Sequence, residues 1–124
     1  MSEAVRYTLP RSARLAGRTA FGAVFAGKVK VSRGSFSLWG KANGLGYCRF
    51  GTSIGRPSGN AVVRNLIKRR VREGYRHVRK QLEGGYDLVL VIRPHEPMSR
   101  QEYQTLIVQL HGKLHGQLAG NDAK

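Results

Sequence analysis

The chain has 124 residues, of which 22 are lysine or arginine and only 7 are aspartate or glutamate, so its formal net charge is +15. This length predicts a single domain over residues 1–124, because domains usually contain about 100 to 150 residues. A soluble fold tolerates such self-repulsion when a polyanion screens it, and nucleic acid is therefore the expected partner.

The sequence disfavours membrane proteins and cysteine-based sites. No apolar run approaches the roughly 18 residues of a spanning helix, and the N-terminal region lacks the apolar stretch of a signal peptide. Cys48 is the only cysteine, which excludes an internal disulfide and a cysteine-based zinc site within the chain. We therefore expect a cytoplasmic protein with no membrane partner, in which Cys48 is a small buried residue.

The chain is predicted to begin with an arm and a short helix. Residues 1–13 show no periodicity and are expected to form a mobile basic arm. Phe21, Val24 and Phe25 then recur at spacings of three and four, as on one face of a helix. Gly27 is expected to end this helix.

Three strands are predicted next. Val29 and Val31 begin an alternating apolar pattern that continues through residues 28–54. The pair Asn43-Gly44 predicts a hairpin turn between the second and third strands, because a tight hairpin requires positive φ at both central residues and these two side chains tolerate it.

A long basic helix is predicted over residues 61–82. Residues 55–60 form a loop rich in glycine and proline, Asn60 is placed to cap the helix, and Gly84-Gly85 follows its end. One third of the helix circumference is apolar and is expected to face the core: Val63, Ile67, Val71, Tyr75, Val78 and Leu82.

Cations occupy the adjoining arc of this helix: Arg64, Lys68, Arg69, Arg72, Arg76, Arg79 and Lys80. A solvated helix face normally mixes signs, because like charges four residues apart repel by a few tenths of a kcal/mol. Here Glu73 is the only acid between residues 61 and 82, which indicates a polyanionic partner. Arginine can grip two phosphate oxygens or stack on a base.

RNA is favoured over DNA because no helix-turn-helix, zipper or zinc pattern would orient the helix in a major groove.

The last part of the chain is predicted to hold a strand and a helix. Residues 86–92 are nearly all apolar, as in a central strand buried on both faces. Ser99 and Glu102 form a capping box for a helix that covers one sheet face through its apolar residues. Residues 119–124 are expected to form a ragged tail. The apolar positions of the last helix are Tyr103, Leu106, Ile107, Leu110 and Leu114.

No pattern predicts catalysis by this chain alone, since no serine or cysteine is grouped with histidine and an orienting acid. His111 and His115 have the spacing of metal ligands but no nearby carboxylate or cysteine, and we interpret them as surface histidines. Asp87 is expected to pair with a neighbouring arginine rather than to hold a hydrated magnesium ion.

The segment from Gly59 to Glu73, GNAVVRNLIKRRVRE, resembles the signature of the bacterial ribonuclease P protein family. Matching pieces occur in the family's order, from Arg14-Leu15 to Arg93-Pro94, so the resemblance spans about residues 9–115.

Two departures from the family pattern stand near the basic helix. Leu66 replaces the second arginine of the family's Arg-Asn-Arg triplet, and Arg56-Pro57-Ser58 stands where similar proteins often carry lysines.

The resemblance implies a fold. It is an α/β (α+β) two-layer sandwich like the second domain of ribosomal protein S5, with a short helix, three strands, the basic helix, a fourth strand and a C-terminal helix. The basic helix would lie in a left-handed βαβ crossover, whereas general rules predict a right-handed one.

The resemblance also implies a role as protein subunit of ribonuclease P, the endoribonuclease that removes the 5′ leader of precursor tRNA. The catalytic centre and most of the Mg²⁺ would belong to the partner RNA and substrate, and no small-molecule cofactor would be needed. The positions matching contacts with the catalytic RNA are Arg64, Asn65, Lys68, Arg69, Arg72 and Arg76. The positions matching the leader cleft are Phe21, Phe25, Trp39 and Ser53.

Physical chemistry fits this assignment, because aromatic faces beside a positive groove suit a single strand, with stacking worth about 1 to 3 kcal/mol per base. Core packing is the ordinary role of such rings and stays open for Phe21 and Phe25. Composition alone also permits a small ribosomal protein or a DNA-binding protein.

Overall fold

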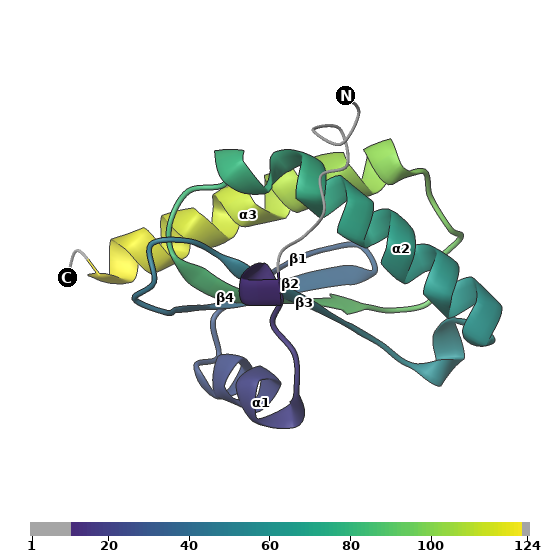
Figure 1. Ribbon diagram of the computed structural model, residues 1–124, viewed down its shortest axis with the longest axis horizontal. Helices are drawn as coiled ribbons and strands as arrows, with labels where there is room; N and C mark the ends of the chain where they lie inside the picture. Colours follow the sequence, from purple (N-terminus) through teal and green to yellow (C-terminus); the bar gives the residue numbers. More distant parts are fainter. Residues whose placement is uncertain (1–10, 123–124) are drawn as a thin grey trace.

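The computed structural model describes residues 11–122, which form three α-helices and one four-stranded sheet (Figure 1). Helices α2 and α3 lie on one face of the sheet and α1 lies on the other (Figure 1). The elements are α1 (Arg18–Ala26), β1 (Lys30–Arg33), β2 (Phe36–Ala42), β3 (Arg49–Ile54), α2 (Ala61–Val78), β4 (Tyr86–Ile92) and α3 (Arg100–Asp122). Three short 3-10 turns are η2 (Arg11–Ala13), η3 (Arg56–Ser58) and η4 (Arg79–Gln81).

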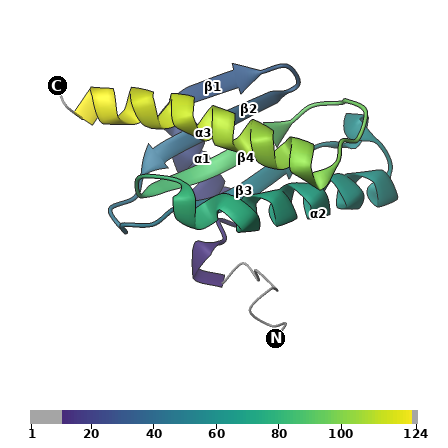
Figure 2. The same cartoon turned by 90° about the horizontal axis from the view of Figure 1, so that it is seen from above.

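The strands lie in the order β1-β2-β4-β3, so the last strand of the chain is inserted between the second and third. It pairs antiparallel with β2 and parallel with β3. In β4, Leu88 and Leu90 face α2 and α3, while Val89 packs against the α1 side, which confirms the predicted central strand. The chain passes from β3 through α2 to β4 with a left-handed crossover (Figure 2).

The predicted hairpin between the second and third strands is wrong, because β4 separates them. The hairpin in this sheet joins β1 to β2 instead. Asn43 and Gly44 do form a turn: the Asn43 side-chain oxygen accepts the Leu45 N–H at 2.8 Å, and Gly44 has φ +71°. The chain therefore bends at the predicted place, but only Gly44 of the pair has the positive φ predicted for both residues. The strand β4, buried on both faces, takes the place between β2 and β3.

Side chains cap the two long helices as the sequence predicts. The Asn60 Oδ1 atom accepts the N–H of Val63 at 3.0 Å at the start of α2. Ahead of α3, Ser99 N–H donates to Glu102 Oε1 at 2.9 Å, and Glu102 N–H donates to Ser99 Oγ at 3.1 Å. The α-helical part of the basic helix ends earlier than predicted, at Val78, and η4 continues it.

The main core lies between the sheet and helices α2 and α3. The apolar stripe of α2 points into it, with Ile67, Val71 and Tyr75 fully buried. The Tyr75 ring stacks on Phe50 of β3, with centroids 4.1 Å apart. Burial of each large side chain contributes about 1.5 to 3 kcal/mol, so this stripe fixes how α2 is rotated about its own axis.

Both ends of the described region differ from expectation. Residues 11–13 are the turn η2 rather than part of an arm, because Ala13 is fully buried, while residues 1–10 lie outside the described residues. Helix α3 continues through Asp122, so residues 119–122 are not a ragged tail. Among the described residues, none of the helices combines the length and apolar character needed to cross a bilayer.

Candidate nucleic-acid interface

Most cations of α2 lie on the solvent side of the helix, whereas Arg70 donates to the Met98 carbonyl at 2.8 Å. Arg69 and Arg72 are exposed, as is Asn65, while Arg64 and Lys68 are half-buried. Because the apolar stripe is fixed against the sheet, the adjoining arc must face outward. The structure therefore presents the predicted RNA-binding residues together on one accessible surface.

Acids neutralise little of this arc. Glu73, the only acid in the sequence of α2, lies 3.8 Å from Arg76 in an ion pair. The Nε atom of Arg76 is buried without a hydrogen-bond partner among the described residues, so this side chain offers only part of its guanidinium to a ligand. The Arg64 Nε atom donates to the Gly59 carbonyl at 3.1 Å, which orients that side chain at the start of the helix.

A cleft of about 360 Å³ joins the basic helix to α1. Lys68 and Arg72 of α2 line one wall, and Phe21 of α1 lines another. Arg14 and Thr52 contribute to the remaining surface. The cleft thus brings an aromatic ring and two cations together around a space that opens to solvent.

The predicted aromatic residues form a chain of edge-on contacts. The centroids of Phe21 and Phe25 lie 6.4 Å apart, and those of Phe25 and Trp39 lie 5.1 Å apart. The Lys30 ammonium lies 5.0 Å from the centre of the Trp39 ring. All three rings are half-buried, because they pack against a small second core while keeping part of each surface in solvent. Core packing and ligand contact are therefore compatible here.

Not every predicted leader residue reaches the cleft. Phe21 lines it, whereas Phe25 and Trp39 continue the aromatic chain along the α1 side of the sheet. Ser53 is half-buried on β3, two residues beyond Gly51, and does not line the cleft.

Gly51 controls how closely α1 approaches the sheet. A Cβ atom at this position would lie 2.5 Å from the Leu15 carbonyl oxygen and 2.7 Å from two carbons of the Phe21 ring. Only glycine allows this packing, so Gly51 positions one wall of the cleft. The sequence analysis did not assign Gly51, Arg14 or Thr52 to the cleft. For Gly51 a signal was available, because a glycine inside a predicted strand marks the close approach of another segment.

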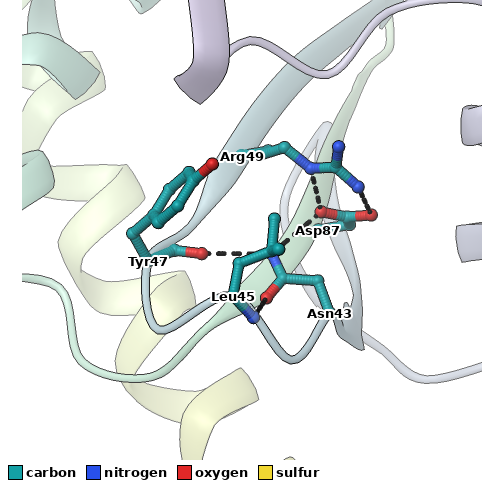
Figure 3. A network of polar contacts seen from close by, with 5 residues as sticks. All are labelled: Asn43, Leu45, Tyr47, Arg49 and Asp87. Atoms are coloured by element: carbon teal, nitrogen blue, oxygen red, sulfur yellow. Dashed lines mark hydrogen bonds and ion pairs between the residues drawn. The ribbon is translucent and has the colours of Figure 1, made fainter.

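Asp87 is fixed by a polar network at the starts of β3 and β4 (Figure 3). Arg49 donates from Nε to Asp87 Oδ1 and from Nη2 to Oδ2, both at 2.7 Å, and Asn43 Nδ2 donates to Oδ1 at 3.0 Å. Burial raises the pKa of Asp87, but the hydrogen bonds from Arg49 and Asn43 outweigh burial and hold the pKa below its ordinary value. The predicted pairing of Asp87 with an arginine is confirmed.

The interpretation of His111 and His115 as surface residues is wrong for His111, whose side chain is buried. The loop after α2 folds over α3, and the His111 Nε2 atom donates to the Glu83 carbonyl at 2.7 Å. His115 lies 3.0 Å from a Glu83 carboxylate oxygen, so a carboxylate is near after all. In the described region no group of three or more histidine, cysteine, aspartate or glutamate residues could hold a metal ion.

Comparison with known proteins gives a consistent result. The family model Ribonuclease P matches residues 9–115. The ribonuclease P protein component of Nitrosococcus oceani is 39% identical over 90 residues, covering 72% of this chain and 75% of that protein. That of Thermotoga petrophila is 33% identical over 104 residues, covering 84% and 87%.

Solved structures show the same fold. The ribonuclease P protein of Thermotoga maritima matches with a TM-score of 0.70 at 28% identity, covering 79% of this chain and 94% of that one. The Staphylococcus aureus protein matches with a TM-score of 0.68 at 26% identity, covering 79% and 91%. With most of its length matched by the family model and by these relatives, the chain belongs to the ribonuclease P protein family.

Proposed function

We propose that this chain is the protein subunit of ribonuclease P and that it binds the catalytic RNA along α2 and the 5′ leader of precursor tRNA at the cleft. The observation that carries this proposal is the position of Phe21 opposite Lys68 and Arg72 around one open space. A single strand lying there can stack a base on the ring while its phosphates meet the two cations. The same helix face then continues toward the catalytic RNA.

Each part of the surface has a separate task in this proposal. Arg64, Asn65 and Arg69 contact the backbone of the catalytic RNA, where arginine suits a bidentate grip on phosphate. Phe25, Trp39 and Ser53 extend the leader path along the sheet. Neutralising phosphates on both RNAs reduces their mutual repulsion, which otherwise has to be screened by metal ions or salt.

Chemistry at the scissile bond is assigned to the partner RNA. We propose that Mg²⁺ is held mainly by that RNA and the substrate, where it would activate water for phosphodiester hydrolysis. The described residues do not offer a fitting metal site: they hold no cluster of donors, and both Asp87 carboxylate oxygens accept hydrogen bonds from Arg49. We assign no step of the reaction to a side chain of this protein and propose that it acts in the cytoplasm.

Reconstitution tests the role of the whole chain. Purified protein is mixed with the catalytic RNA and precursor tRNA at a magnesium concentration too low for the RNA alone. We expect cleavage at the mature 5′ end of the tRNA. Absence of cleavage together with absence of binding to the catalytic RNA would contradict the proposal.

A second experiment tests the leader cleft. The variant Phe21→Leu keeps an apolar side chain in the second core but removes the ring that stacks on a base. We expect weaker binding of precursor tRNA by the holoenzyme, with unchanged binding of mature tRNA and of the catalytic RNA. Equal loss for precursor and mature tRNA would show that the ring has no contact with the leader. Family membership does not favour the alternatives of a ribosomal or DNA-binding protein.

A further inference from the structure

A second, smaller cleft lies where the basic helix ends. It has a volume of about 230 Å³, and its lining includes Tyr47 and Cys48 from the loop before β3 and Arg79 and Lys80 from η4. Arg79 comes seven residues after Arg72 in the sequence, roughly 10 Å further along the helix axis and on nearly the same side. This cleft therefore continues the cationic arc beyond the leader cleft.

The wall that carries Tyr47 is fixed by hydrogen bonds (Figure 3). Asn43 holds both sides of the loop, because its Oδ1 atom accepts the Leu45 N–H at 2.8 Å and its Nδ2 atom donates to the Tyr47 carbonyl at 3.0 Å. The same Nδ2 atom donates to Asp87, which ties the loop to β4. Of Tyr47 only the backbone carbonyl is hydrogen-bonded in this network, while the hydroxyl end of its ring points toward Arg49 (Figure 3).

Glycines allow the loop before β3 and the loop before β4 to pack closely together. A Cβ atom on Gly85 would lie 2.9 Å from the Gly46 nitrogen, so the loop before β3 and the loop before β4 touch through their backbones. The Asn43 N–H donates to the Gly85 carbonyl at 3.0 Å, and the Cys48 thiol donates to the Gly84 carbonyl at 3.4 Å. The cleft is thus formed before any ligand arrives, which lowers the entropic cost of binding.

The chemistry of this cleft is that of a single-stranded nucleic-acid site. Tyr47 is 39% exposed, unusually high for a large aromatic residue on a fixed loop. In the described region neither Arg79 nor Lys80 forms an ion pair. Of the acids on β4 and the loop before it, Asp87 is paired with Arg49, and Glu83 contacts His115 at 3.0 Å. Favourable interaction with the helix dipole accounts for cations at a helix end, but not for an exposed ring beside them.

We propose that this cleft binds one unpaired nucleotide of the catalytic RNA, with its base stacked on Tyr47 and its phosphate held by Arg79 and Lys80. The volume of the cleft lies below the roughly 300 to 1000 Å³ of sites for drug-sized ligands. The cleft therefore takes the phosphate of the nucleotide, while the base stays at the rim. We assign the nucleotide to the catalytic RNA because the cleft lies at the far end of the cationic arc of α2. This assignment rests on the proposed function of that arc in binding the catalytic RNA.

The test compares variants in binding to the isolated catalytic RNA. We expect Tyr47→Ala to weaken binding about tenfold, because stacking on one base is lost, whereas Tyr47→Phe keeps the ring and binds as the wild type does. The double variant Arg79→Ala with Lys80→Ala should also lower the salt dependence of binding by about one phosphate contact, because both side chains hold the same phosphate. Lys113→Ala, an exposed cation on α3, serves as the matched control and should have no effect.

Chemical probing of the RNA bases locates the contact. One unpaired base should be protected by the wild-type protein and by Tyr47→Phe but exposed with Tyr47→Ala. Wild-type affinity and protection in Tyr47→Ala would overturn the proposal, and so would a loss confined to precursor tRNA, since that would place the site on the substrate. Failure of the proposed function is distinguishable, because the wild-type protein itself would then not bind the catalytic RNA.

Discussion

Arg49 and Asp87 form a two-point ion pair between the starts of the parallel strands β3 and β4, although they are 38 residues apart in the sequence. Asn43 donates to the same carboxylate, so the end of β2 is joined to this pair. The network therefore stabilises the place where the last strand enters the sheet and where the loop carrying Tyr47 begins.

Asp87→Asn should lower the free energy of unfolding by about 1 kcal/mol, a modest figure because the Arg49 side chain is 36% exposed and solvent screens the pair. The pKa of Asp87 is lowered in the folded state, so its contribution is present above the unfolded pKa of about 3.9 and is lost as the pH falls through the folded pKa. Urea unfolding at several pH values checks this. A wild-type and a variant curve that stay parallel down to pH 3 would count against it.

Gly51→Ala should destabilise the protein by about 1 to 3 kcal/mol, because the new methyl group meets a backbone oxygen and the Phe21 ring. It should also weaken binding of precursor tRNA, since α1 has to move. Gly22→Ala is the matched control: it lies on α1 with no atom within 4 Å of the added carbon, and it should stabilise the helix by about 1 kcal/mol. Thermal unfolding distinguishes the two variants, and so does the difference in holoenzyme affinity between precursor tRNA and mature tRNA.

Tyr75→Phe should raise the free energy of unfolding by about 1 kcal/mol, because the Tyr75 hydroxyl is buried without a hydrogen-bond partner among the described residues. Burial also raises the pKa of this hydroxyl. Tyr103→Phe should instead lower the free energy of unfolding, since the Tyr103 hydroxyl contacts His95 Nε2 at 2.7 Å and accepts the Met98 N–H at 3.1 Å. Urea midpoints that shift the same way in both variants would refute this distinction.

Acidification should weaken the fold through His111. Its Nε2–H donates to Glu83 while its Nδ1 atom is buried without a partner in the described region, so a second proton would be an unpaired buried donor. Burial, aided by His115 nearby, lowers the pKa of His111. The unfolded chain therefore binds the proton more readily, and stability should fall as the pH drops below about 6.5. His111→Gln should flatten this part of the curve measured by urea unfolding.

Lys68→Ala should weaken assembly with the catalytic RNA and reduce the slope of log affinity against log salt by about 0.7 to 0.9, the loss of one phosphate contact. Lys113→Ala on α3 should leave both quantities unchanged. Filter binding at four salt concentrations measures both the affinity for the catalytic RNA and its salt dependence. A slope identical to wild type for Lys68→Ala would remove Lys68 from the interface.

The sequence was most informative where the pattern is local and repeated. The stripe through Ile67, Val71 and Tyr75 gave the orientation of α2 and hence the exposure of its cations. The turn at Asn43 and Gly44 was also correct as a turn, but its partners were not, because the strand that separates β2 from β3 appears about 40 residues later and leaves no local trace. Strand order is a long-range property.

The same limit applies to the candidate site. Phe21 and Lys68 were both identified, but their meeting around one cleft depends on how α1 packs against the sheet, and that depends on Gly51. His111 was misinterpreted because its burial comes from a loop outside its own helix. Position along one element predicts which way a side chain points, but not what later covers it.

The late insertion of β4 has a consequence for biosynthesis. Until residues 86–92 have left the ribosome, β3 lacks the strand beside it and α2 has no completed sheet on which to rest its apolar stripe. A nascent chain that exposes the cationic segment too early would offer it to any nearby RNA, including the ribosome's own. We expect functional assembly to begin only after β4 has been synthesised, since its pairings with β2 and β3 complete the sheet.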